Sequence, residues 1–210
     1  MSDAQNHIAH YHLPGLFEFY ELYRLFLPLW KEHREYFYDW CDIGSIYGAP
    51  ADCIWGGGRV GFGDNDPQEV LALMQEYGIS ARLTFSNSLL REEHLSDRKC
   101  NALCAAFEKA GRNGVIVHSE LLLDYLKKNY PEHYLVSSTT KVLTEFEDFR
   151  RELQRDVFAY VVPDFRLNKE FENVSRAEMP YSCISAKTSC GSLSPNPTRP
   201  PPQMQSAGAP

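Results

Sequence analysis

No run of lysine or arginine longer than two residues occurs in this 210-residue chain, and the formal net charge is −7. Broad, non-specific nucleic-acid binding is therefore not expected. The first twelve residues lack an apolar run after a charged start, so no secretory signal is predicted. The most apolar early segment, Leu13–Trp30, contains Glu18, Glu21 and Arg24, which excludes it as a membrane span. No membrane contact is predicted, and a cytoplasmic location is expected.

The common catalytic signatures are also missing. GxSxG, HExxH, the P-loop and paired CxxC motifs are all absent, so no common hydrolase or nucleotide-hydrolysing mechanism is indicated. Cys100 and Cys104 lie four residues apart and share a face of a predicted helix, which admits metal ligation. With Leu103 and Phe107 beside them and no second cysteine pair, buried small side chains are the better interpretation. No metal ligands and no cofactor are assigned.

Apolar patterning predicts that strands and helices alternate along most of the chain. Helices are expected at 16–30, 67–77, 97–109, 120–130 and 144–153. Strands are expected at 38–43, 79–85, 115–117, 133–137 and 157–162. Such alternation through short connections gives a parallel sheet with right-handed crossovers. We predict an α/β fold of the (β/α)-barrel type, incomplete at about five βα units, because eight units typically need ~250 residues.

Three regions are predicted: a flexible N-terminus over residues 1–12, a partial barrel domain over 13–173, and a tail over 174–210. The first region holds three histidines that admit metal binding, but a mobile terminus is favoured because no partner segment is evident. The tail has seven prolines from Pro180 onward and no apolar period, so disorder is expected.

Two interpretations of the tail remain open. It is either a natural flexible tail or an unrelated sequence that replaces further barrel units. The second is favoured, because about five parallel units leave the edges of the sheet open. Self-association through such an edge is then expected.

A glycine-rich stretch separates the first predicted strand from the helix at Pro67. Its segment Gly56–Gly61 satisfies GxGxxG, but a dinucleotide site needs these glycines directly between strand and helix. A loop whose backbone N–H groups and Arg59 meet an anionic ligand is favoured over that site. Glycines that serve only tight turns are an equally open alternative.

Polar residues follow the predicted strands, and parallel strands bring their carboxyl ends to one rim. We expect proton transfer by Asp42, His118 and Asp164. His118 is the natural acid or base, because an unperturbed histidine has a pKa of about 6.5. The structural alternatives are a hydrogen-bonded His118 and an ion pair between Asp164 and Arg166. The residues expected to bind the substrate are Arg59, Ser86, Asn87, Ser138, Thr139, Lys141 and Arg166.

Two runs carry a resemblance to a known family. HYLVSSTTKVLT (His133–Thr144) and FAYVVPDFRLNKEF (Phe158–Phe171) resemble strand-end segments in the barrel domain of the bacterial collagenase-like peptidases and their uncharacterised relatives. The glycine loop is similar in position to that family's first-strand loop, and the similarity spans residues 37–172. The resemblance implies a (β/α)₈-type barrel with its site at the carboxyl ends of the strands.

Members of that family have been linked to peptide hydrolysis and to hydroxylation of RNA bases, and many carry a cysteine cluster after the sixth or a later strand. Cys183 and Cys190 match no such cluster spacing. An iron–sulfur or other metal cluster is therefore expected only in full-length relatives. Two functions follow: a barrel-type enzyme or remnant acting on a polar or anionic substrate, or a non-catalytic module whose rim docks a peptide or protein partner.

Overall fold

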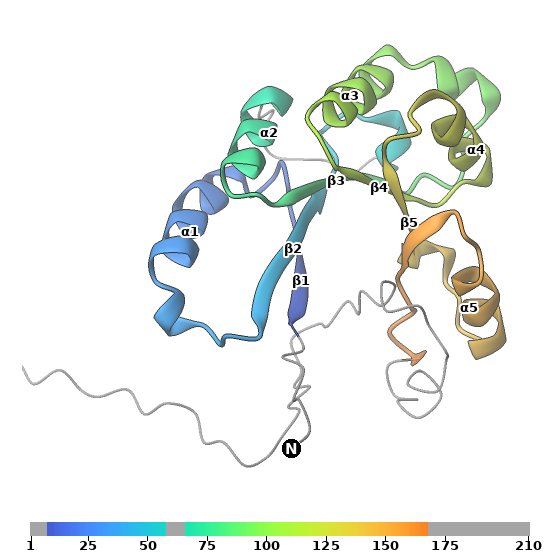
Figure 1. Cartoon of the computed structure of the whole chain (residues 1–210). Coiled ribbons are helices and arrows are strands. Elements are labelled where there is room, and N and C mark those ends of the chain that lie inside the picture. The colour runs from blue at the N-terminus through green and yellow to red at the C-terminus, as the bar shows by residue number, and fades with distance from the viewer. Residues whose placement is uncertain (1–7, 58–65, 168–210) are drawn as a thin grey trace, which may run out of the picture.

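The computed structural model describes residues 8–57 and 66–167, which form an α/β half-barrel. Its sheet has six strands in the order β1-β2-β3-β4-β5-β6, and every neighbouring pair is parallel. Figure 1 shows this sheet curled, with the helices on its outer side. The strands are β1 (Ala9–Pro14), β2 (Cys41–Gly48), β3 (Ser80–Phe85), β4 (Gly114–Val117), β5 (Tyr134–Ser137) and β6 (Phe158–Val161).

Five helices connect the strands, as the predicted alternation requires. They are α1 (Tyr20–Glu32), α2 (Pro67–Glu76), α3 (Arg98–Lys109), α4 (Glu120–Asn129) and α5 (Phe146–Leu153). Short 3₁₀ turns follow several strands: η2 (Ile54–Gly56), η3 (Glu92–Ser96) and η4 (Thr139–Lys141). The α2 helix begins with Pro67 after Asp66, whose carboxylate accepts a hydrogen bond from the Gln68 backbone N–H at 2.9 Å. The predicted fold class is confirmed.

Two elements near the N-terminus differ from the prediction. The region expected to be flexible up to residue 12 instead contains β1, and the first predicted strand is displaced to Cys41–Gly48, so six strands replace about five. The apolar pattern missed β1 because it is an edge strand without a single buried residue. Gly44 made the second half of β2 look like part of the glycine-rich loop. The strand needs a glycine there, because an added Cβ would lie 2.9 Å from both His10 Cβ and His12 Cε1.

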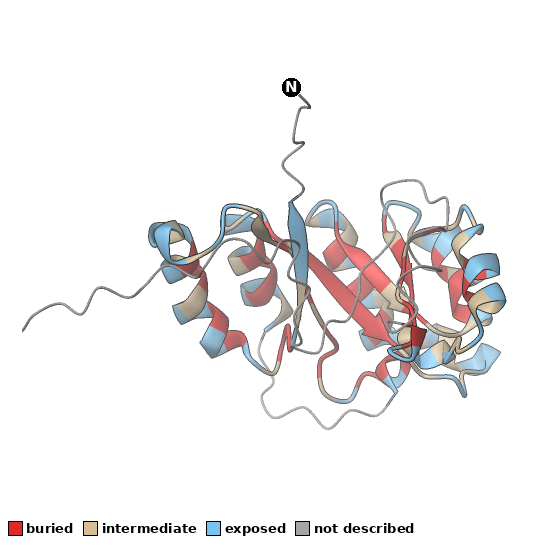
Figure 2. Cartoon of the chain, turned by 90° about the horizontal axis from the view of Figure 1, so that it is seen from below, coloured by how far each residue is buried: buried red, intermediate tan, exposed pale blue. Residues whose placement is uncertain are grey.

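The apolar core lies between the outer face of the sheet and the helices. Leu83 and Phe85 of β3 and Val115 of β4 are fully buried there. The α1 helix buries Leu27 and Trp30 against the same core. Figure 2 shows the central strands buried behind helices whose outer faces are exposed, whereas β1 has no buried residue. This packing holds the strands in the positions that set the site.

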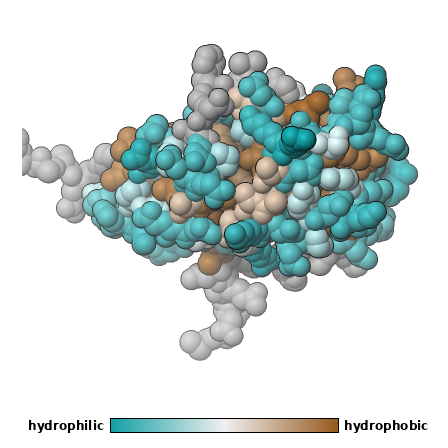
Figure 3. All heavy atoms as spheres, turned by 90° about the horizontal axis from the view of Figure 1, so that it is seen from above, coloured by the Kyte–Doolittle hydropathy of each residue, from teal (hydrophilic) through white to brown (hydrophobic). Residues whose placement is uncertain are grey.

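The outer surface is mostly hydrophilic on the face seen in Figure 3, with apolar residues in separate groups. No helix in the described part of the chain is long and apolar enough to cross a membrane. The predicted tail at 174–210 lies outside the described residues, as do residues 1–7.

Candidate functional site

The inner face of the curled sheet is polar. Side chains alternate between the two faces of a strand, so Arg82 and Thr84 of β3 face inward while Leu83 and Phe85 face the helices. Side chains from five strands make up what we name the inner-face cluster: His12, Ser45, Arg82, Tyr134 and Tyr160. The interior of a (β/α) barrel is usually packed with branched apolar side chains, so these polar side chains mark the inner face as a candidate site.

Arg82 is the centre of this cluster and is only 2% exposed. Its Nε donates a hydrogen bond to Tyr134 Oη at 2.8 Å, and its guanidinium carbon lies 4.4 Å from the centre of the Tyr160 ring. Among residues 8–57 and 66–167, it forms no ion pair with a carboxylate. Because burying an uncompensated charge is costly, the inner face favours an anion beside Arg82.

Gly114 makes the contact between Tyr134 and Arg82 possible. In the register of the sheet, Gly114 of β4 lies between Arg82 and Tyr134. A Cβ at Gly114 would lie 2.4 Å from Tyr134 Cε2, so only a glycine lets the ring lie across β4. The Tyr134 hydroxyl then reaches Arg82 and also Ser80 Oγ, at 2.5 Å.

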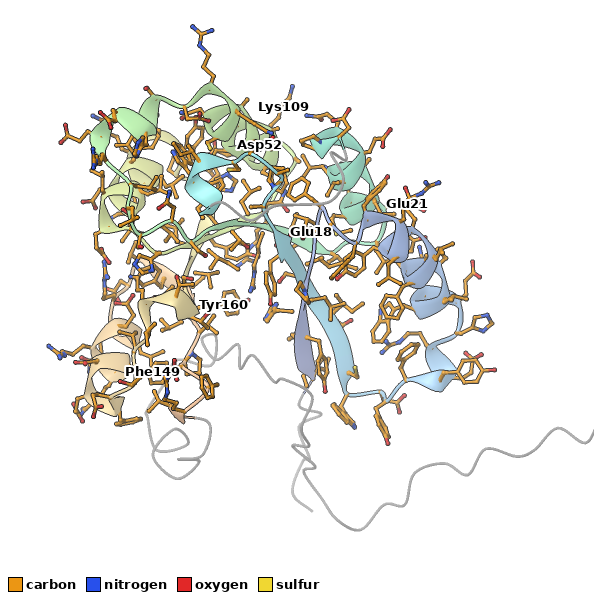
Figure 4. The ribbon with its side chains drawn as sticks, turned by 180° about the vertical axis from the view of Figure 1, so that it is seen from behind. Glu18, Glu21, Asp52, Lys109, Phe149 and Tyr160 are labelled. Carbon is orange, nitrogen blue, oxygen red and sulfur yellow. The ribbon has the colours of Figure 1, made fainter. Side chains whose placement is uncertain are left out.

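His12 joins the first strand to the last. Its Nδ1 lies 2.7 Å from Ser45 Oγ, and its ring meets Tyr160 of β6 edge-on at a centroid distance of 5.7 Å. Figure 4 shows Tyr160 pointing into the space that the curled sheet encloses, whereas Phe149 lies on the helix side. Burial, and then the positive charge of Arg82, lower the pKa of His12 to about 4. His12 is therefore neutral at neutral pH.

Thr84 adds an unsatisfied donor to the inner face. Its Oγ1 is buried and has no hydrogen-bond partner in the described part of the chain. Buried hydroxyls in proteins are nearly always paired, so Thr84 is an unusual residue of the inner face.

The second polar group lies at the carboxyl ends of β3, β4 and β5, and we name it the rim cluster: Ser86, His118, Ser138 and Thr140. His118 Nδ1 lies 2.8 Å from Thr140 Oγ1, which lies 2.9 Å from Ser138 Oγ. Ser138 Oγ in turn lies 3.5 Å from Ser86 Oγ. Burial and then the Lys141 charge lower the pKa of His118. An unprotonated imidazole next to a hydroxyl can accept its proton.

Lys141 is held in an ion-pair network beside the rim cluster. Its Nζ lies 2.6 Å from Glu152 Oε1 and 2.9 Å from Glu120 Oε1, and Arg155 contacts both carboxylates. The hydrogen bonds from Arg155 to Glu120 lower the pKa of Glu120 to about 2, with Lys141 adding to the effect. Ser137 Oγ donates to Glu152 at 2.6 Å, which ties the network to β5. Lys141 therefore stabilises the packing of α4 and α5, and its charge is already compensated.

Asp164 and Arg166 form an ion pair with each other, which was the structural alternative to the roles predicted for them in proton transfer and substrate binding. Arg166 Nη1 lies 3.2 Å from both carboxylate oxygens, and the Arg166 backbone N–H donates to Oδ1 at 3.0 Å. Asn87 also has a structural role: its Nδ2 donates to the Ile54 carbonyl, and its Oδ1 accepts from Leu89 N–H. Thr139 lies at the start of η4, but the hydroxyl beside His118 belongs to Thr140.

Asp42 does not lie at the rim, so its predicted position there is wrong. It is the second residue of β2 and hence lies at the opposite end of the sheet, where its Oδ2 is 3.7 Å from His10 Nδ1. The misplacement follows directly from the misplaced strand. Arg59 and most of the glycine loop lie outside the described residues.

Sequence reasoning missed the inner-face cluster because it examined strand ends and not strand interiors. The available signal was the alternation in β3, where Ser80, Arg82 and Thr84 interrupt apolar residues at every second position. A cavity of about 380 Å³ lies at the other end of β5 and β6, lined by residues that include His133, Tyr134 and Asp156. We place the site at the inner face and rim, because more polar groups converge there.

Comparison with protein-family models, curated proteins and solved structures finds no match. The resemblance to the collagenase-like peptidases therefore stays a prediction. The described residues contain no group of three or more histidine, cysteine or acidic side chains placed to hold a metal ion.

Proposed function

We propose that this half-barrel is an enzyme domain that acts on a small substrate carrying a carboxylate or phosphate. The observation that carries this proposal is Arg82, a buried guanidinium on the inner face without a carboxylate partner among the described residues. Arg82 binds the anionic group of the substrate, since a guanidinium matches carboxylate and phosphate geometry. Tyr134 and Tyr160 hold it in place.

The rim cluster supplies the chemistry in this proposal. His118 follows β4 four residues after Gly114, the register neighbour of Arg82, so the two groups are separated by roughly 13 Å along the strand direction. A substrate held by Arg82 at one end presents its other end to His118. His118 takes a proton from a water molecule or from the Thr140 hydroxyl, and the deprotonated oxygen attacks the acyl carbon of the substrate. The bond from that carbon to the leaving group then breaks, and His118 returns the proton to the leaving group. Hydrolysis of an acyl bond fits both this arrangement and the resemblance to peptidases.

A non-catalytic binding module is the second candidate. Its support is that Asp164, predicted for proton transfer, and Lys141 and Arg166, predicted to bind the substrate, already form ion pairs within the chain. In that case the rim hydroxyls and Arg82 hold a peptide or small molecule without reaction.

The test separates binding from chemistry. Thermal shift with phosphate, acetate and short peptides should show stabilisation of the wild type and none of Arg82→Met, with Arg24→Met as a surface control. Hydrolysis of a panel of peptides and esters should then be lost in His118→Ala and kept in Arg24→Met. Binding without hydrolysis by the wild type would favour the module. Equal shifts for wild type and Arg82→Met would contradict the anion site.

A further inference from the structure

Three buried cysteines lie together behind the rim. Cys53 lies directly before η2 in the loop after β2, and Cys100 and Cys104 lie on α3. All three side chains are at most 4% exposed. The Cys53 and Cys100 sulfur atoms are 3.2 Å apart, although 47 positions separate the residues in the sequence.

The surrounding contacts fix both sulfur-bearing segments. Asp97 caps α3 by accepting from the Cys100 backbone N–H at 2.8 Å, and Lys99 Nζ donates to the Ala51 carbonyl at 2.7 Å. Trp55, two residues after Cys53, is fully buried, and its ring nitrogen donates to the His94 carbonyl at 2.8 Å. These hydrogen bonds fix the backbone on both sides, so the Cys53 and Cys100 thiols are held next to each other.

The two thiols differ in acidity. The hydrogen bond from the Cys100 thiol lowers the pKa of Cys53, and the same bond together with burial raises the pKa of Cys100. Burial also raises the pKa of Cys104. Since the thiolate is the nucleophile, Cys53, which is also the least buried of the three, is the one expected to react first.

We propose that Cys53 and Cys100 are a redox-active pair that a peroxide converts into an intramolecular disulfide. The Cys53 thiolate attacks one peroxide oxygen and becomes a sulfenic acid, and the other oxygen leaves as water after taking up protons. Cys100 sulfur then attacks Cys53 sulfur and displaces the hydroxyl, which leaves as a second water with the Cys100 proton. The two cysteines lose two electrons in total, and one peroxide is reduced to two waters.

The bond links the loop after β2 to α3 next to the rim. The Trp55 carbonyl in that loop accepts from the backbone N–H of Asn87, which directly follows Ser86 of the rim cluster. Fixing Cys53 to α3 therefore restrains one wall of the candidate site. Closing the sulfur gap needs a movement of only about 1 Å, within reach of small side-chain rotations. This inference does not depend on the proposed function.

The test treats the full chain with hydrogen peroxide and maps its tryptic peptides without reduction. Cys53 lies in peptide 35–59 together with Cys41, and Cys100 lies in peptide 100–109 together with Cys104. The double variant Cys41→Ala/Cys104→Ala therefore assigns the bond and should still form the cross-linked peptide. Cys53→Ala and Cys100→Ala should each lose it. The oxidised wild type should melt roughly 5–15 °C higher, and dithiothreitol should reverse the shift.

Three results would overturn the proposal. The first is a cross-link that disappears in the Cys41→Ala/Cys104→Ala variant. The second is a cross-link that forms only in urea, because the folded state would then not bring the thiols together. The third is oxidation of Cys53 to its sulfinic acid with Cys100 left as a free thiol. If an alanine variant fails to fold, Cys100→Val fills the buried site and serves in its place.

Discussion

The two faces of the same strands differ in what they contribute. On β3, Leu83 and Phe85 face the helices and are fully buried among apolar side chains, whereas Arg82 and Thr84 are also buried but face inward without full polar compensation. Burial alone therefore does not separate the apolar core from the polar inner face. The outer face stabilises the fold, and we propose that the charge and hydroxyl groups of the inner face bind a ligand.

The largest effect is expected on the outer face. Phe85→Ala removes a ring that contacts Trp55 edge-on at 5.3 Å and should lower the free energy of unfolding by about 3–5 kcal/mol. The matched inner-face change Thr84→Val removes an unpaired hydroxyl and should be neutral or stabilising. Urea denaturation of both variants measures the contrast. Equal destabilisation by the two changes would contradict the difference proposed between the outer and inner faces of β3.

The next effect is a dependence of stability on pH from the inner face. The pKa of His12 is about 4 in the folded chain. Between pH of about 6.5 and 4, the His12 imidazole is therefore protonated in the unfolded chain but not in the folded chain. Its effect on the free energy of unfolding is absent above this range, and the free energy of unfolding falls as the pH is lowered through it. Each unit of pKa difference corresponds to about 1.4 kcal/mol of unfolding free energy. After a reduction for the partial exposure of His12, the expected loss is about 2–3 kcal/mol.

His12→Gln removes this titrating group and should flatten the profile between pH 6.5 and 4.5. Below that window, the wild type and the variant should both lose stability, since Glu120 has a pKa of about 2 and its ion pairs weaken as it is protonated. Denaturation midpoints measured from pH 3 to 8 check both statements. An unchanged slope in His12→Gln would show that other groups carry the dependence.

Gly114→Ala should have a smaller effect on the free energy of unfolding, and this effect should depend on the Tyr134 ring. The new Cβ meets Tyr134, and displacing that ring should lower stability by about 1–3 kcal/mol. In a Tyr134→Ala background, the same change should have almost no effect. A double-mutant cycle on the unfolding free energies measures this coupling. Additive effects would mean that the backbone, and not the ring, opposes the methyl group.

The smallest change in stability is expected for Arg82→Met. Replacing a buried charge by an apolar side chain of similar size should alter the free energy of unfolding by less than about 1 kcal/mol, or raise it. Tyr134 keeps its hydrogen bond to Ser80 in this variant. Thermal unfolding checks the expected near-neutrality. A loss of several kcal/mol would mean that Arg82, like the outer-face residues, mainly stabilises the fold.

The sequence allows the outer face to be predicted better than the inner one. Apolar periodicity located β3 to β6 and all five helices, because their burial against one another leaves a pattern in the residues. Edge strand β1 and glycine-containing β2 carry little of that pattern, and the error in β2 placed Asp42 at the wrong end of the sheet. The positions of His118, Ser86 and Ser138 at the carboxyl ends of the strands were predicted from strand ends alone. The partners of Lys141 lie 11 and 21 residues away, which no local pattern reveals.

The strand order also matches the order in which the strands are synthesised. Each strand pairs with the strand before it in the sequence, so every new βα unit docks onto a surface that has already been made. Each parallel pairing still closes a loop that contains a whole helix, which is slower than forming a hairpin. The contact between His12 and Tyr160 is different, because it joins the first strand of the sheet to the last. This contact can form only after β6 has been synthesised, so the polar inner face is completed late in synthesis.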